Sequence, residues 1–362
     1  MAFDVDKMHV THEGFGLLLG AGASCQAGYP LMDGLTRQVL RSLDAADVEV
    51  IASIVKADLG TELDIGRATP SIEVITDVLE ARMASLSIAS TDSQVLQAVS
   101  ERIRTSIVGI MCQQHPRLDD HVRLFQALKR CLGGKPCSIW VFTTNYDLLV
   151  EWGAAIAGLP VYDGFYGSSL RFFDIGSIGL KHGAYRPDGR GGNVFVAVRT
   201  PQVNLLKLHG SVNWWICGND EAYSSDRSPT FCSNPRRALV LPRKSKVRDI
   251  LEYPFEGLWR LASEVLGREC KYVTSVGFSY GDQHIRERLL LPKVRRNEIA
   301  LTALLKDETE AIDMFRGLPS FQCSAGTESS LWRFKDFVNY VCSTVGWPEE
   351  GSDVALRNRQ SH

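Results

Sequence analysis

The sequence lacks closely spaced cysteine pairs and long apolar runs. Nine cysteines are scattered over 362 residues and no C-x-x-C pair occurs, so we expect neither a disulfide framework nor a structural zinc ribbon. No apolar run approaches the ~18 residues that suggest a membrane span. The N-terminus also lacks the basic and then apolar pattern of a signal peptide. These absences predict a cytoplasmic protein whose cysteines are mostly buried thiols, with no bound metal and no membrane contact.

An excess of either charge is also missing. Lys and Arg total 40 against 42 Asp and Glu, which gives no bulk attraction to nucleic acid, and we expect no direct nucleic acid binding. The basic run at 243–246 is the local exception, and such runs are usually solvated loops. Hydrophobic residues make up 44% of the chain, enough for a sizeable core. The length suits two average domains, or one α/β domain with large insertions.

Short apolar segments alternate with helical patterns at both ends of the chain. This alternation, with glycine turns at the strand exits, predicts an α/β fold with a Rossmann-like, doubly wound parallel sheet. We expect helices at 31–40, 250–266 and 308–316. The expected strands are 14–19, 138–144, 193–199, 204–208, 238–241, 272–277 and 299–304.

Two insertions interrupt this pattern. Residues 35–130 have apolar residues at helical spacing and form a large helical insertion, in which Ser71 suits the N-cap of a helix after Pro70. Residues at about 155–203 are rich in glycine and aromatic side chains and form an irregular insertion. We therefore expect one domain over 1–345 and a polar tail over 346–362.

The first expected strand ends in a glycine-rich turn. Gly20, Gly22 and Gly28 have the spacing G-x-G-x5-G, which differs from the usual dinucleotide-binding G-x-G-x-x-G. Glycines here allow a sharp turn and let backbone N–H groups approach a pyrophosphate at a helix N-terminus. A plain structural turn is the alternative. Asp44 is an ambiguous candidate for the acidic residue expected ~20 positions later.

Read together, four segments resemble the motifs of the sirtuin family, in the same order. The resemblance implies a sirtuin-like Rossmann domain that uses NAD. The segments are Gly20-Ala21-Gly22-Ala23-Ser24 with Gly28-Tyr29-Pro30, Phe142-Thr143-Thr144-Asn145-Tyr146-Asp147, Lys207-Leu208-His209-Gly210-Ser211, and Gly277-Phe278-Ser279-Tyr280-Gly281-Asp282-Gln283-His284-Ile285.

The chain departs from the deacylase branch of that family in two places. It has no paired cysteines for the four-cysteine zinc module, and Leu31-Met32-Asp33 stands where a deacylase has an Asp-Phe-Arg run. The long helical insertion, with Ile72-Glu73 inside it, resembles the bacterial antiphage branch of NAD hydrolases that lacks the zinc module. The resemblance therefore implies hydrolysis of NAD rather than NAD-dependent removal of an acyl group from lysine.

The resemblance implies that Asn145 and His209 are catalytic. An amide can both donate to and accept from a ribose hydroxyl and a water, while an imidazole can act as a general base near neutral pH. The nicotinamide leaves as a neutral molecule and needs no general acid, unlike most glycosidase leaving groups. The structural alternatives are an asparagine favoured in a strand-to-helix turn and a histidine without a chemical role.

The remaining candidates bind the cofactor. Asp147 contacts cofactor hydroxyls, orients Asn145 or caps the next helix, whereas Asp282 reaches the adenosine ribose or caps the helix over 284–290. Trp214 and Trp215 are candidates for a wall of the nicotinamide pocket, with core packing as the alternative, and His182 and His284 are taken as structural. The cofactor-binding set is Gly20, Ala21, Gly22, Ser24, Pro30, Thr144, Asp147, Gly277, Ser279 and Asp282.

The leading interpretation is an NAD+ hydrolase that releases nicotinamide and ADP-ribose and acts in antiphage defence by NAD depletion. Such an enzyme must stay silent until triggered, so the related groups imply a homo-oligomer, a HerA-type ring translocase ATPase or an Argonaute-like partner. One alternative is an NAD-dependent protein deacylase or ADP-ribosyltransferase. The other is a non-catalytic sensor of NAD or ADP-ribose.

Overall fold

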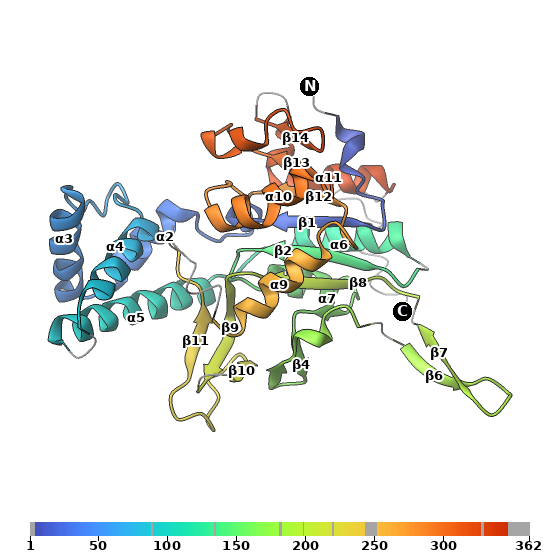
Figure 1. Ribbon diagram of the computed structural model, residues 1–362, viewed down its shortest axis with the longest axis horizontal. Helices are drawn as coiled ribbons and strands as arrows, with labels where there is room; N and C mark the ends of the chain where they lie inside the picture. The colour runs from blue at the N-terminus through green and yellow to red at the C-terminus, as the bar shows by residue number, and fades with distance from the viewer. Residues whose placement is uncertain are drawn as a thin grey trace.

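A seven-stranded parallel sheet forms the centre of the molecule, as the alternating pattern predicts. The computed structural model describes residues 4–87, 90–133, 135–180, 183–197, 199–218, 221–242, 252–326 and 329–346. The strand order is β14-β13-β12-β1-β2-β8-β3 (Figure 1). Its strands are β1 (Phe15–Leu19), β2 (Ser138–Thr143), β3 (Val161–Tyr162), β8 (Gln202–Lys207), β12 (Tyr272–Val276), β13 (Ala300–Leu304) and β14 (Phe321–Ser324).

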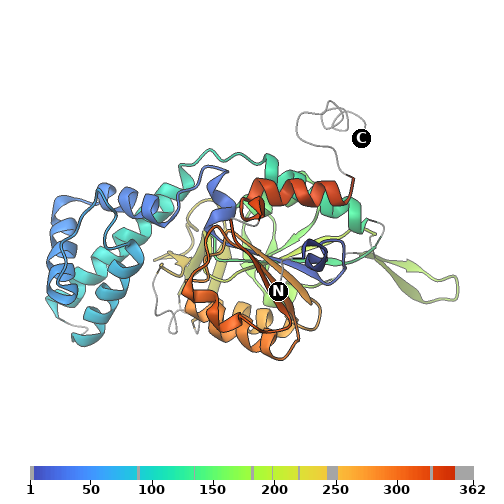
Figure 2. The same cartoon turned by 90° about the horizontal axis from the view of Figure 1, so that it is seen from above.

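Helices cover both faces of this sheet (Figure 2). Because neighbouring side chains of a strand point to opposite faces, Leu17 and Leu18 of β1 join different cores. On the face of Leu17 lie α6 (Asp119–Leu132), α7 (Leu149–Ile156) and α11 (Phe334–Thr344). On the face of Leu18 lie α9 (Phe255–Val265), η3 (His284–Leu290) and α10 (Leu291–Arg295). The fold is therefore doubly wound.

The strand order reverses next to β1. After β1 the chain continues to β2 and β8 on one side, and it later returns to β12 on the other side of β1 before continuing to β13 and β14. In open α/β sheets, ligands bind beyond the carboxyl ends of the strands at such a reversal. The turns that follow β1 and β12 therefore border the expected site.

A helical module, defined here as α2–α5, lies beside the sheet and has its own apolar core (Figures 1 and 2). It comprises α2 (Met32–Ser42), α3 (Ala45–Leu59), α4 (Ile72–Ser85) and α5 (Thr91–Cys112). We had expected the insertion to run over 35–130, but Leu124 and Leu128 of α6 pack in the sheet core. Ser71 is the N-cap of α4 as expected, but its side chain caps nothing. The Ile72 N–H donates instead to Thr36 Oγ1 of α2, at 2.9 Å.

Two expected strands lie outside the parallel sheet. Expected strand 238–241 corresponds to β11 (Arg236–Leu239), the edge of a five-stranded antiparallel sheet in the order β11-β9-β10-β5-β4. The other members of this sheet are β9 (Gly210–Cys217), β10 (Glu221–Ser224), β5 (Arg171–Phe173) and β4 (Phe165–Gly167). Expected strand 193–199 is β7 (Asn193–Ala197), which pairs only with β6 (Gly183–Pro187) in a projecting hairpin (Figure 1). The expected irregular insertion thus contains ordered short strands.

The remaining elements are short. The helix expected over 308–316 is the 3-10 helix η4 (Glu310–Phe315), and the helix expected from 250 begins at Phe255 as α9. Three further 3-10 turns, η1 (Val5–Met8), η2 (Ile175–Ser177) and η5 (Ser330–Trp332), and the short α1 (Ala21–Cys25) complete the elements. The basic run at 243–246 and residues 347–362 lie outside the described residues. Among the described helices, none has the length and apolar character needed to cross a membrane.

Candidate active site

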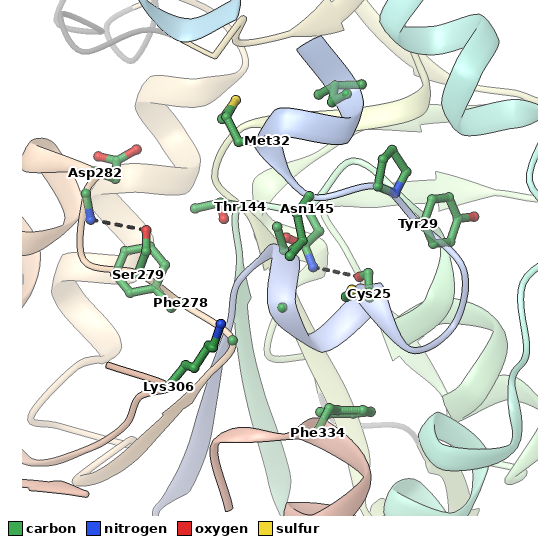
Figure 3. Close-up of a pocket in the computed structure, with 18 of the residues that line it drawn as sticks. Cys25, Tyr29, Met32, Thr144, Asn145, Phe278, Ser279, Asp282, Lys306 and Phe334 are labelled. Atoms are coloured by element: carbon green, nitrogen blue, oxygen red, sulfur yellow. Dashed lines mark hydrogen bonds between the residues drawn. The ribbon is translucent and has the colours of Figure 1, made fainter. Parts of the chain in front are cut away.

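A cavity of about 700 Å³ lies at the carboxyl edge of the sheet, where the strand order reverses. Of the residues expected in the site, Asn145, His209 and all the cofactor-binding candidates except Gly20 line it. Figure 3 shows Thr144 and Asn145 facing the same space as Phe278, Ser279 and Asp282. Four segments that are far apart in the chain therefore meet at one cavity, whose volume is typical of small-molecule sites.

Two glycine turns, one after β1 and one after β12, pack directly on each other. The Gly20 N–H donates to Val276 O at 3.1 Å, and the Gly22 N–H donates to Gly277 O at 2.9 Å. A Cβ on Gly22 would lie 2.6 Å from Gly277 Cα, and a Cβ on Gly277, whose φ is +66°, would lie 2.2 Å from Ala23 N. Gly20 and Gly22 are therefore needed for close packing of backbone on backbone, and their two amides are not directed at a ligand as we had expected.

The side-chain amide of Asn145 is held in one orientation. Its Nδ2 donates to Gly20 O at 2.9 Å and to Ser24 Oγ at 2.8 Å. Because a backbone carbonyl only accepts hydrogen bonds, the amide nitrogen must point to Gly20 and the amide oxygen must point elsewhere. Both hydrogens of the amide are thus used within the protein. Asn145 can accept a hydrogen bond in the cavity, but it does not combine donor and acceptor roles there as the sequence suggested.

Ser24 links Asn145 to Asp147. The Ser24 hydroxyl accepts from Asn145 and donates to Asp147 Oδ2 at 2.7 Å, so its hydrogen points to the carboxylate rather than to a phosphate. Asp147 Oδ1 accepts from the Leu149 N–H at 3.1 Å. Burial raises the pKa of Asp147, while Lys207 and the bond from Ser24 oppose this rise. Asp147 therefore bonds to the first amide of α7, whose N-cap residue is Leu148, and through Ser24 it orients Asn145.

The fully buried Lys207 contacts the turn that follows β2 and carries Asn145 and Asp147. Lys207 Nζ contacts Asp147 O and lies 2.8 Å from both Glu151 Oε1 and Ser211 Oγ. Burial raises the pKa of Glu151, and the neighbouring Lys207 opposes that rise. A buried ammonium needs a counter-charge and several acceptors, and this cluster supplies them. Lys207 thereby ties the end of β8 to the turn that carries Asn145.

His209 lies in the turn between β8 and β9 and its side chain is buried. Its Nε2 is 3.1 Å from Asp282 Oδ2, a distance within the range of ion pairs. Asp282 also accepts the Ile285 N–H of the first turn of η3 at 3.1 Å, although the N-cap residue of that helix is Gln283. The imidazole and the last glycine turn are therefore in direct contact.

The segment 238–242 connects His209, Tyr146 and the helical module. The Val240 N–H donates to His209 O at 3.0 Å, and Val240 O accepts from the Tyr146 hydroxyl at 2.5 Å. From the helical module, Arg104 donates to Leu239 O and Thr76 donates to Pro242 O. The helical module is therefore hydrogen-bonded to the segment that also bonds to the His209 backbone and to the Tyr146 hydroxyl.

The structure places several other candidates away from the cavity. Trp214 and Trp215 do not line it and fit the core-packing alternative, because Trp214 packs in the core and Trp215 donates to Ser225 O and lies under Arg237. Asp44 lies in the helical module, where it caps α3 through the Asp47 N–H at 2.8 Å. His284 is buried in η3, as expected of a structural residue. His182 lies outside the described residues.

The sequence also failed to identify several residues of the cavity wall. Lys306 and Asp307 follow β13, whose carboxyl end faces the cavity, and the general rule for open α/β sheets would have pointed to them. The other missed residues come from the helical module and the start of α11, which no sequence pattern joins to the site. They include Met32, Leu35, Met111, Trp332, Arg333 and Phe334. Glu73 of the helical module also lines the cavity.

All nine cysteines are free thiols in the structure. Among the described parts of the chain, no three His, Cys, Asp or Glu side chains gather in a way that could hold a metal ion.

Part of the chain is similar to a known protein family. Residues 140–302 match the SIR2-like domain family. No curated protein matches the chain. The matched segment includes Asn145, His209 and the turn at Gly277, and it begins after the first glycine turn. Within these residues the chain is similar to a SIR2-like domain, which supports the sirtuin-like family.

Proposed function

We propose that this protein is an NAD+ hydrolase that cleaves the bond between nicotinamide and ribose. The observation that carries the proposal is that Asn145, with its amide oxygen left to accept, and His209 line one cavity at the reversal of the sheet. The similarity to a SIR2-like domain supports an NAD-related activity in a broad sense. The hydrolytic reaction is our inference from the side chains.

Two cations of the cavity wall suit the anionic pyrophosphate of a dinucleotide. Lys306 and Arg333 are exposed at the β13 and α11 side. The acidic Asp307 follows Lys306 and also lines the cavity, while Glu73 lines it from the helical module. We place the nicotinamide ribose at Asn145 and the pyrophosphate at Lys306 and Arg333, whose charge is opposite.

The reaction needs little chemistry from the protein. The bond from the ribose C1′ to the nicotinamide nitrogen breaks, its electron pair leaves with neutral nicotinamide, and a water oxygen bonds to C1′. Asn145 Oδ1 accepts a hydrogen bond from that water or from a ribose hydroxyl and so fixes its position. His209 accepts the proton that the water loses. The products are nicotinamide, ADP-ribose and one proton.

Hydrolysis rather than deacylation is favoured by two features of this chain. Its nine cysteines contain no C-x-x-C pair for the zinc module of deacylases. The helical module contributes Met32, Glu73 and Met111 to the cavity wall, and such an insertion resembles the antiphage hydrolases. We extend the proposal to antiphage defence by NAD depletion, with activation by self-assembly, a HerA-type ring translocase ATPase or an Argonaute-like protein.

The test is to incubate the purified full chain with NAD+ and to separate the products by chromatography, with and without an acetylated-lysine peptide. Equal amounts of nicotinamide and ADP-ribose without peptide would support the proposal. NAD consumption that requires the peptide would indicate a deacylase or an ADP-ribosyltransferase instead. Binding without product at a concentration that permits self-assembly and with the candidate partners would indicate a sensor.

A further inference from the structure

The contact between His209 and Asp282 joins two segments that the sequence separates by more than 70 residues. The imidazole lies in the turn that follows β8, and the carboxylate lies in the turn that follows β12. The side chains are 6% and 8% exposed, and Nε2 lies 3.1 Å from Oδ2. Both residues line the cavity. A carboxylate this close to a buried imidazole must affect its protonation and its orientation.

The backbone fixes the position of the Asp282 carboxylate. Its Oδ1 accepts the Ile285 N–H at 3.1 Å, and its backbone carbonyl accepts the Arg286 N–H at 3.0 Å at the start of η3. Figure 3 shows Asp282 on the same side of the cavity as Ser279 and Phe278, facing the side that carries Asn145. One oxygen therefore bonds to the first turn of η3, and the other oxygen approaches the imidazole from a fixed position.

Besides His209 and Asp282, several charged residues lie in or near the cavity wall, on other elements of the fold. Lys207, two residues before His209, directs its ammonium to Asp147 O and Glu151. Glu73 comes from α4, Asp147 from the turn after β2, Lys306 and Asp307 from the turn after β13, and Arg333 from the residue before α11. The Asp282 carboxylate lies 3.1 Å from the ring, close enough to act strongly on the charge of His209.

We propose that Asp282 is the positioning residue of His209. Its Oδ2 lies 3.1 Å from Nε2, and its negative charge stabilises the imidazolium that forms when His209 accepts the proton from the attacking water. In this scheme the proton stays on His209 and is not passed on to Asp282. This inference rests on the proposed function and adds a third residue to Asn145 and His209.

The first test compares Asp282→Asn with the wild type and with Asp44→Asn. Asp44 caps α3 in the helical module and does not line the cavity, so it is a matched capping aspartate. We expect Asp282→Asn to lower kcat for nicotinamide release by about 10- to 100-fold, a part of the roughly 10²- to 10⁴-fold that a positioned general base contributes, with KM little changed. The acid limb of the pH profile should move to lower pH by about one unit, because the imidazolium loses a neighbouring negative charge. Asp44→Asn should behave like the wild type.

Three results would overturn this inference. Unchanged kcat and an unmoved acid limb would show that Asp282 does not act on His209. A raised KM with an unmoved limb would assign Asp282 to a ribose contact. Higher activity in Asp282→Asn would mean that the carboxylate restrains the histidine.

A second measurement separates this inference from the proposed function. The histidine C2–H signals are followed by NMR as a function of pH, and the signal of His209 is identified by its loss in His209→Gln. The titration midpoint of His209 should fall by about one pH unit in Asp282→Asn, even if no nicotinamide is ever released. An unchanged midpoint would refute the link to Asp282. Absent turnover in the wild type with a shifted midpoint would refute only the proposed hydrolysis.

Discussion

Ser24 and Asn145 are joined by a 2.8 Å hydrogen bond across the two turns that follow β1 and β2. The same serine hydroxyl passes its own hydrogen to Asp147. The asparagine proposed to hold water or ribose is thus oriented by a chain of side chains that ends in a buried carboxylate. A residue without direct contact to substrate can therefore control the catalytic asparagine.

Replacing Ser24 with alanine should impair catalysis more than substrate binding. The change removes one acceptor of the Asn145 amide and the donor to Asp147, so the amide becomes free to turn. We expect kcat for nicotinamide release to fall about tenfold with a smaller change in KM, and unfolding in urea to show a loss of about 1–3 kcal/mol. Ser53→Ala, which removes an exposed hydroxyl in α3, is the control and should change neither. A wild-type kcat in Ser24→Ala would show that Ser24 is not needed to orient Asn145.

Replacing Gly277 with alanine should separate the two glycine turns. Gly60 provides a matched control, because both glycines have a φ of +66° but nothing lies within 4 Å of a Cβ placed at Gly60. Gly60→Ala should cost about 1 kcal/mol of stability from backbone strain alone. Gly277→Ala should cost several times more and should also abolish nicotinamide release, since its Cβ would strike Ala23 N. Equal losses of stability in Gly60→Ala and Gly277→Ala, measured by urea unfolding, would show that the close packing of the two glycine turns does not contribute to stability.

His121 should make the fold sensitive to acid. Its ring is buried against Phe334, at a centroid distance of 4.4 Å, and burial lowers the pKa of His121 to about 3. The unfolded chain takes up a proton near the ordinary value of 6.5 while the native state does not, so stability falls as pH drops from 6.5 toward 3. The slope is about 1.4 kcal/mol per pH unit. His121→Leu should remove this slope from urea unfolding between pH 4 and 6.

The exposed His115 serves as the control for that measurement. His115→Leu should leave the dependence of stability on pH as it is in the wild type. If His121→Leu and His115→Leu gave the same slope as the wild type, the buried ring would not be the source of the acid sensitivity.

Lys306 should contribute to substrate binding rather than to the reaction. It is exposed, follows β13 and lines the cavity on the side assigned to the anionic half of NAD. Lys306→Ala should raise KM several-fold, more at low salt than at high salt, because exposed charges are screened. Its kcat should stay near the wild-type value. Lys56→Ala, in α3 of the helical module, should change neither parameter, and a loss of kcat in Lys306→Ala would contradict the assignment.

The sequence predicted the parallel sheet and most of the cavity because these depend on local patterns. Buried strands of a parallel sheet are continuous apolar runs, and the motif residues follow such strands directly. The same patterns do not identify the partner of a strand, which is why β7 and β11 lie outside the main sheet. For the same reason a residue close to His209 in sequence need not face the cavity, and Trp214 packs in a core instead.

The detailed chemistry of the site could not be read from sequence for another reason. Gly20 and Gly22 suggested a phosphate turn, but whether their amides face a ligand or another turn depends on β12, which follows more than 200 residues later. The contacts of His209 with Asp282 and of Asn145 with Ser24 are likewise tertiary. The order of the motifs predicted that these residues lie in one site. It did not predict which of their atoms contact other protein groups and which face the cavity.

The most direct test of the central claim is nicotinamide release from NAD+ by Asn145→Ala and His209→Ala, measured beside the wild type. Asn193→Ala in the exposed β7 and His115→Ala provide controls of the same residue types away from the cavity. We predict that the two cavity variants fold and bind NAD but release nicotinamide at least 100-fold more slowly, while the controls match the wild type. Full turnover in either cavity variant would contradict the account.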